Sequence, residues 1–243
     1  TRPKVVICVP SAITEVERRA VTDAARRAGA ADAQLIEQPM AAAIGAQLPI
    51  DEPIGNMIID IGGGTSETAV ISLGGIVALE AVRVGSFDID VAIQNYVRRE
   101  HGIAIGERTA EDIKVAIGSA AVTPDEVEAE VNGRDLMQGL PKTVVLTPEE
   151  IRYAIDDTVT QIVQSVVRCL AKAPAELAQD FLGRGIHLVG GGGLLRGLAQ
   201  RIELETHVPV LMADMPLEAV VLGAGHCIEN YDQLKRMFMG QRR

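Results

Sequence analysis

An apolar, strand-like run that ends in three consecutive glycines constrains the fold of this chain more than any other feature. The segment from Ile58 to Glu67 reads Ile-Ile-Asp-Ile-Gly-Gly-Gly-Thr-Ser-Glu, and Asp60 is its one charged residue before the glycines. Glycine lacks a β-carbon, so the backbone N–H groups can approach a polyphosphate and φ can turn positive. A carboxylate at a buried strand end is costly unless it meets a cation such as magnesium. The segment therefore predicts a phosphate-binding hairpin; the alternative is an ordinary glycine-rich hairpin with a solvated Asp60.

A second apolar run, Ile186–Val189, leads into the glycines 190–193 and then into an amphipathic segment. Glycines ahead of a helix expose N–H donors and the positive end of the helix dipole, which suits phosphate or sugar oxygens. Two such turns in one chain point to a nucleotide. Neither a Gly-x-Gly-x-x-Gly Rossmann turn nor a Gly-x-x-x-x-Gly-Lys-Ser/Thr P-loop occurs in the sequence, so those two classes of nucleotide site are excluded.

The composition of the chain argues against some classes of partner and cellular location. A formal charge of −10 and an aromatic content of 2% argue against nucleic acid, which needs a basic face or stacking platforms. No apolar run approaches the roughly 18 residues of a membrane span, and no signal-peptide core follows the N-terminus. We therefore expect a soluble, cytoplasmic protein. The chain starts at Thr1 rather than at a methionine, directly before an apolar strand, so we expect a fragment or a processed product.

Strand and helix signals alternate along the chain, which predicts an α/β fold. We expect strands over residues 4–9, 34–37, 127–131, 142–146 and 208–212, and a three-stranded meander over residues 57–84. We expect helices over residues 14–29, 40–45, 87–100, 109–118, 194–205 and 216–228, and a long helix that opens at Thr147 and packs on the meander. Thr109 is the expected cap of its helix, and Asn132-Gly133 is the expected hairpin turn.

Several motifs carry a resemblance to a known family. The run from Asp60 to Thr65 resembles the second phosphate motif of the superfamily of actin, sugar-kinase and heat-shock-chaperone ATPases, and the run from Val189 to Leu198 resembles its adenosine motif. Other segments are similar, in the same order, to the MreB family of bacterial actin-like proteins: residues 6–11, 15–20, 38–45 and 105–111. The resemblance covers nearly the whole chain.

The resemblance implies an actin-like ATPase fold, which is ribonuclease H-like. Residues 1–54 would be a remnant of the first domain, with 55–84 and 147–243 forming the second, nucleotide-binding domain and 85–146 a small α+β insert. The C-terminal helix would return to the first domain. The first phosphate hairpin of the family has no counterpart before Lys4, so the chain would supply half of the phosphate clamp.

The same resemblance assigns an ATP or ADP site with magnesium. Asp60 would hold the metal through water, Glu67 would lie in its outer shell, and the hairpin would bind the β- and γ-phosphates through Gly62, Gly63, Gly64 and Thr65. Ribose and adenine would meet Glu111, Lys114, Gly118, Gly190, Gly191 and Gly192. Glu111 and Lys114 share a helix face, and a solvated pair is the alternative.

The expected catalytic residues are Gln38, Asp60 and Thr65. At the position of Gln38 the MreB family typically has a glutamate that activates the attacking water, whereas actin has glutamine. An amide can orient water but cannot accept its proton, and the adjacent Glu37 points to the other face of its strand. We therefore expect at most a weak ATPase, and only when the missing hairpin is supplied.

The resemblance also implies partners. It predicts filaments of the protein itself, a role in cell shape and in the organisation of cell-wall synthesis, and contacts with cell-wall elongation and membrane-associated shape proteins at the inner face of the cell membrane. A tail contact with an anionic membrane would use Lys235, Arg236, Met237, Phe238, Met239, Arg242 and Arg243, against the alternative of a solvated tail. The rival functions are another soluble ATPase, a kinase or chaperone, and a non-hydrolysing actin-like module that binds full-length partners.

Overall fold

A five-stranded sheet forms the centre of the protein. The computed structural model describes residues 2–239. The sheet order is β10-β9-β3-β4-β5; β3, β4 and β5 form an antiparallel meander, and β9 pairs in parallel with β3 and β10. These strands are β3 (Asn56–Ile61), β4 (Ser66–Ser72), β5 (Gly75–Val82), β9 (Ile186–Val189) and β10 (Val210–Met212). The predicted meander is therefore confirmed.

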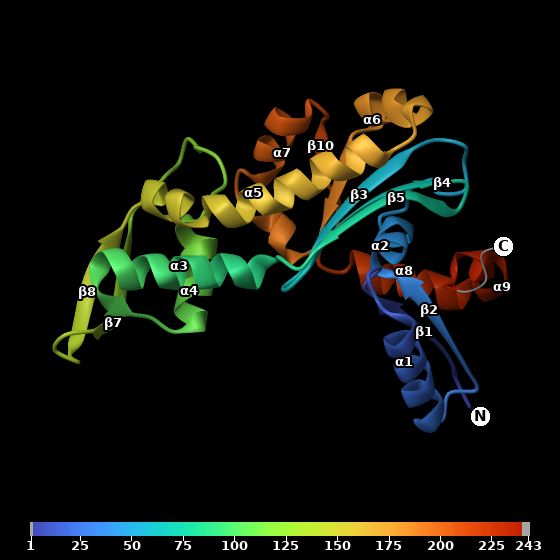
Figure 1. The fold of residues 1–243 in the computed structure, drawn as a ribbon, viewed down its shortest axis with the longest axis horizontal. Coiled ribbons are helices and arrows are strands. Elements are labelled where there is room, and N and C mark those ends of the chain that lie inside the picture. The colour runs from blue at the N-terminus through green and yellow to red at the C-terminus, as the bar shows by residue number, and fades with distance from the viewer. Residues whose placement is uncertain (1, 240–243) are drawn as a thin grey trace.

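Helices cover both faces of this sheet (Figure 1). The long helix α5 (Pro148–Lys172) lies on one face, and α2 (Gln38–Gly45) and α8 (Ala219–Glu229) lie on the other. Every residue of β3 is buried as a result. Because side chains alternate along a strand, Ile59 and Ile61 enter the core under α5, whereas Ile58 enters the core under α2 and α8. Asp60 has the parity of Ile58 and so faces α2 and α8.

Two glycines bring α2 and α8 into close contact. A β-carbon on Gly45 would lie 1.8 Å from the carbonyl oxygen of Ala219, and one on Gly223 would lie 1.8 Å from that of Ala41. Any larger residue would force the helices apart. α8 also contacts β1, so this helix lies against the N-terminal part of the chain.

The N-terminal residues form a small parallel sheet of their own. It consists of β1 (Lys4–Val9) and β2 (Asp32–Glu37), joined by α1 (Glu15–Arg27). Thr14 caps α1 in a capping box with Glu17, at the start of the helix expected over residues 14–29. A third sheet, with the order β6-β7-β8, lies at the far end of the molecule beside two helices (Figure 1). Its elements are α3 (Ser86–His101), β6 (Ile103–Ala104), α4 (Glu107–Ile117), β7 (Ala129–Asp135) and β8 (Pro141–Leu146).

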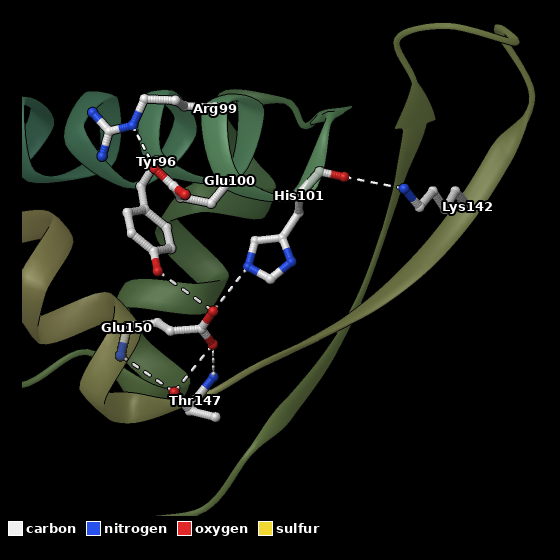
Figure 2. A network of polar contacts seen from close by, with 7 residues as sticks. All are labelled: Tyr96, Arg99, Glu100, His101, Lys142, Thr147 and Glu150. Atoms are coloured by element: carbon white, nitrogen blue, oxygen red, sulfur yellow. Dashed lines mark hydrogen bonds and ion pairs between the residues drawn. The ribbon is translucent and has the colours of Figure 1, made fainter.

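A polar network joins this far end to the start of α5 (Figure 2). Thr147 and Glu150 form a capping box, in which Glu150 Oε2 accepts from the backbone N–H of Thr147 at 2.8 Å. Glu150 Oε1 lies 3.0 Å from His101 Nε2 and accepts a 3.4 Å hydrogen bond from Tyr96 at the end of α3. One carboxylate therefore caps α5 and holds α3 against it.

Two local predictions are wrong. Asn132 and Gly133 lie inside β7, and the hairpin turns at residues 136–140 instead. Asp135 decides this, because its Oδ1 accepts from the N–H groups of Met137 at 2.8 Å and Gln138 at 2.9 Å, which closes the turn there. Thr109 is not a cap, since α4 begins at Glu107 after Gly106, and the acidic Glu107 favours the positive helix end.

The C-terminal third also differs from expectation. The helix predicted from Leu194 begins at Leu198, because Gly197 adopts a φ of +73° and residues Gly191–Leu194 form a separate 3-10 turn. The remaining elements are α6 (Ala178–Arg184), α7 (Leu198–Thr206), α9 (Tyr231–Leu234) and the 3-10 turns Ala175–Leu177 and Lys235–Met237.

The predicted membrane contact of the tail is contradicted for its apolar part. Met237 and Phe238 are fully buried in the core under α2 and α8, and the backbone N–H of Met239 donates to the carbonyl of Leu35 at 2.8 Å. The tail therefore packs on the protein itself. Arg242 and Arg243 lie outside the described residues. Within residues 2–239, no helix combines the length and apolar character needed to cross a bilayer.

Candidate functional site

Strand pairing brings the two glycine turns together. In the parallel pair of β3 and β9, Asp60 is the register partner of Val189. Because parallel strands end at the same edge of a sheet, the turn after Ile61 and the turn after Val189 lie side by side. The two turns are more than a hundred residues apart in sequence, and this register makes them one site.

Asp60 is a buried carboxylate without a protein partner. It is 8% exposed, and within residues 2–239 no donor or cation contacts its oxygens. Burial raises the pKa of Asp60 to about 6. Such a group needs a cation or a donor from a ligand to stay ionised at low cost. The site therefore fits magnesium, which takes one or two carboxylates together with water and phosphate oxygens.

The second predicted acidic residue, Glu67, has a protein partner. It lies directly across the β3–β4 hairpin from Asp60 and is 2% exposed. Ser11, from the loop after β1, donates to Glu67 through its backbone N–H at 3.0 Å and through its hydroxyl at 3.0 Å. Burial raises the pKa of Glu67, and the Ser11 bonds oppose this. Sequence reasoning missed Ser11; its position just after a buried strand and Pro10 was the available signal.

The glycine hairpin between β3 and β4 is anchored by α3. The N–H of Gly62 donates to the carbonyl of Thr65 at 2.9 Å and closes the turn. The carbonyls of Gly62 and Gly63 accept from the N–H groups of Ser86 at 3.0 Å and Phe87 at 2.8 Å, the first residues of α3. Gly64 is exposed, with open space around its α-carbon. The hairpin is therefore fixed at its base and accessible at its tip.

Predicted site residues line two cavities. One of about 320 Å³ is lined by Glu111, Lys114, Gly118, Gly191 and Gly192, so five of the six residues predicted to meet ribose and adenine face one space. The sixth, Gly190, does not line this cavity and packs closely against Asp60 and Ile61 instead. The other cavity has a volume of about 550 Å³. Gly64, Thr65 and Glu67 line one side of it, and Pro10, Ala12 and Ile13 line the other; Arg83 also contributes.

Lys114 has a partner that sequence reasoning also missed. Its Nζ lies 2.9 Å from the carboxylate of Asp90 on α3, and both side chains are nearly buried. Asp90 interrupts the apolar face formed by Ile89 and Ile93, and a lone carboxylate on such a face was the signal. The pair holds the Lys114 side chain at the wall of the smaller cavity, which also includes Arg196 and Leu217.

Gln38 lies at the start of α2 and is half-buried. Its side chain makes no hydrogen bond to any residue in the range 2–239, so the amide is free to meet water or ligand. The neighbouring Glu37 acts on Glu67 through its charge, which adds to the raised pKa of Glu67.

Comparison with known proteins settles the family. The sequence matches the family described as MreB/Mbl protein over residues 1–236. The chain belongs to the MreB/Mbl family. It is 49% identical to the cell shape-determining protein MreB of Escherichia coli (strain K12) over 230 residues, which are 95% of this chain and 66% of that protein. It is 42% identical to the cell shape-determining protein Mbl of Bacillus subtilis (strain 168) over 97% of this chain and 71% of that protein.

Solved structures agree with the MreB/Mbl assignment. MreB5 of Spiroplasma citri bound to ADP superposes with a TM-score of 0.91 at 36% identity, covering 95% of this chain and 70% of that one. The same protein bound to AMPPNP gives a TM-score of 0.90. MamK in a double helical filament gives 0.78 at 18% identity, over 94% of this chain and 69% of that one, which shows the fold alone. The predicted actin-like α/β fold is confirmed. The chain spans 66% of the length of its MreB relative from Escherichia coli.

Proposed function

We propose that this chain binds ATP and ADP with magnesium at the edge of the central sheet. The observation that carries the proposal is the buried, unpartnered carboxylate of Asp60 between the two glycine turns. The ADP and AMPPNP bound by MreB5, a relative with 36% identity, support the same ligand class.

Each wall of the site has a role in this proposal. Gly62, Gly63, Gly64 and Thr65 hold the β- and γ-phosphates through N–H and hydroxyl donors. Asp60 holds the magnesium ion, which when bound neutralises charge on the phosphates. Glu111 and Lys114, with the turn at Gly191 and Gly192, hold ribose and adenine in the cavity of about 320 Å³. Gly118 has no side chain, so adenine can approach the cavity wall closely at this position.

Hydrolysis, where it occurs, is slow. Gln38 orients the attacking water by hydrogen bonding, but its amide cannot take the proton that a glutamate would accept. The glutamine at position 38, where the MreB family typically has glutamate, favours a second candidate function: an actin-like module that binds nucleotide and partners and does not hydrolyse ATP. ATP turnover, measured with the first phosphate hairpin supplied, separates the two candidates. Slow turnover that rises in Gln38→Glu would assign the water-orienting role to this position, and no turnover by the unaltered protein would favour the module that does not hydrolyse.

The assembly we propose is a filament of the protein itself that contributes to cell shape. The MreB and Mbl relatives are cell shape-determining proteins, and the fold is shared with MamK, whose structure is a double helical filament. Head-to-tail contacts between identical subunits generate open strands of this kind. We place the filament in the cytoplasm, at the inner face of the cell membrane, with cell-wall elongation and membrane-associated shape proteins as partners.

Calorimetric titration of the chain with ADP, with magnesium and with EDTA, tests the proposed site. We expect binding only with magnesium, and a loss of about ten-fold or more in Asp60→Ala. Asp23→Ala removes an exposed carboxylate on α1 and is the matched control. Affinity that is unchanged in Asp60→Ala would show that the hairpin is not the magnesium site.

A further inference from the structure

One contact joins the N-terminal sheet directly to the central sheet beside the phosphate hairpin. Ser11 lies in the loop between β1 and α1, and Glu67 lies 56 positions later in β4. The N–H of Ser11 is 3.0 Å from Glu67 Oε1 and 3.2 Å from Oε2, and the Ser11 hydroxyl is 3.0 Å from Oε2. Both carboxylate oxygens thus accept from a single residue of the other sheet.

Burial makes this contact strong. Glu67 is 2% exposed, and hydrogen bonds to an ionised acceptor are roughly twice as strong as neutral ones. Removing the donors would leave a buried carboxylate with its desolvation penalty uncompensated. Thr65 is two residues away in the same hairpin, so the contact lies next to the proposed phosphate site.

The contact also bounds the larger cavity. This space of about 550 Å³ has Gly64, Thr65 and Glu67 on one wall and Pro10, Ala12 and Ile13 on the other. Ser11 does not line the cavity itself, but it lies between Pro10 and Ala12 of the second wall and donates to Glu67 of the first. The separation of the two walls therefore depends on the bonds between Ser11 and Glu67.

Asp60 and Glu67 differ in their hydrogen-bond partners, and this difference indicates different roles. They are cross-strand neighbours on one face of the hairpin, and both are buried. The oxygens of Asp60 meet no donor within residues 2–239, whereas both oxygens of Glu67 are oriented by Ser11. Magnesium needs ligands free to adopt its octahedral geometry, and Asp60 meets that need better.

We propose that Glu67 is a positioning residue that clamps the loop after β1 onto β4 through Ser11, and that Asp60 rather than Glu67 supplies a protein carboxylate for magnesium. The clamp holds the two walls beside the phosphate hairpin at a fixed separation. The clamp between Ser11 and Glu67 is inferred from the structure without any ligand. The second part of the proposal, that magnesium binds Asp60 and not Glu67, rests on the proposed nucleotide function.

Hydrogen exchange of the chain without nucleotide tests the clamp. We expect exchange of backbone amides in residues 11–14 to rise about ten-fold in Glu67→Ala, less in Ser11→Ala, which keeps the backbone donor, and least in Glu67→Gln, which keeps an acceptor. Ser11→Thr restores the hydroxyl and should restore protection. Glu80→Ala, which removes a carboxylate of β5 paired with Lys172, is the matched control and should leave exchange in residues 11–14 unchanged. Protection of α5 amides reports that each variant is folded. Wild-type exchange of residues 11–14 in a folded Glu67→Ala would overturn the clamp.

The magnesium concentration that gives half-maximal ADP binding tests whether magnesium binds Asp60 and not Glu67. We expect Asp60→Asn to raise it about ten-fold or more and Glu67→Gln to change it less than about three-fold. Equal increases in the two variants would overturn the assignment and make Glu67 a second metal residue. Absence of ADP binding by the unaltered chain would overturn the proposed function and the magnesium half of this inference, while the exchange experiment still decides the clamp.

Discussion

A β-carbon on Gly190 would lie 2.6 Å from the Oδ1 of Asp60. The same atom would lie 2.3 Å from the carbonyl oxygen of Ile61, and Gly190 also has a φ of +83°. Glycine is thus required here for both space and backbone conformation. The turn after β9 therefore lies so close to the carboxylate at the end of β3 that a side chain at position 190 would displace it.

Gly190→Ala should therefore weaken magnesium-dependent ADP binding by about ten-fold or more and destabilise the fold by about 1–3 kcal/mol. Calorimetry and urea unfolding measure the two effects. Gly225→Ala, at a site with open space in α8, is the control: it should leave ADP binding unchanged and stabilise the fold by about 0.5–1 kcal/mol, because alanine is the better helix former. Full ADP affinity in Gly190→Ala would show that Asp60 does not depend on this turn.

Asp60→Asn should stabilise the ligand-free protein at pH 7.5 and not near pH 4. Burial raises the pKa of Asp60 from 3.8 to about 6, so the native state binds more protons than the unfolded state in this window. The stability that the protonated form contributes is fully present below pH 3.8 and is lost as the pH rises through about 6. At neutral pH the cost is on the order of 3 kcal/mol.

Urea unfolding of both proteins at pH 4 and pH 7.5, with EDTA, measures this difference. Magnesium and ADP should then stabilise the unaltered protein more than Asp60→Asn, since only the carboxylate offers the metal a charge. A stability difference of the same size at both pH values would contradict the burial of an unpartnered carboxylate.

Lys114→Met should destabilise the protein by about 2–4 kcal/mol, because it leaves the nearly buried Asp90 without its cation. Adding Asp90→Asn should recover part of this loss. Lys172→Met is the control: Lys172 pairs with Glu80 but is 61% exposed, so its loss should be below about 1 kcal/mol. Chemical unfolding compares the variants, and equal losses at the two lysines would show that the Lys114 pair is not desolvated.

Glu150→Ala should cost about 1–2 kcal/mol, more than Glu17→Ala. Both glutamates close a capping box, but Glu150 also meets His101 and Tyr96 and so holds α3 against α5 (Figure 2). Glu17 lies on the exposed surface of α1 and caps that helix alone. Denaturant unfolding compares the two variants, with the change in midpoint read at equal m-values. An equal loss of stability for the two variants would mean that the contacts to α3 add nothing.

The amino-acid sequence by itself determined the elements whose signals are local. Apolar runs between glycine turns predicted the strands of the meander, the helix starts at Thr14 and Thr147 followed from local capping residues, and the glycine runs marked both turns of the candidate site. Where a local signal competed with another, prediction failed. Asp135 closed the hairpin turn in place of Asn132-Gly133, and Gly197 delayed the helix expected at Leu194, because each offered the backbone a better-bonded alternative.

Only the tertiary structure decided which of these residues meet. The register of β3 with β9 placed Asp60 beside Gly190, and the packing of the N-terminal sheet brought Ser11 to Glu67. It also buried Met237 and Phe238, which the composition of the tail had suggested for a membrane. Such contacts join positions far apart in the chain, and they depend on strand register and on the burial of whole faces. No local pattern of residues encodes either of these, because the free energy that selects them belongs to the packed core.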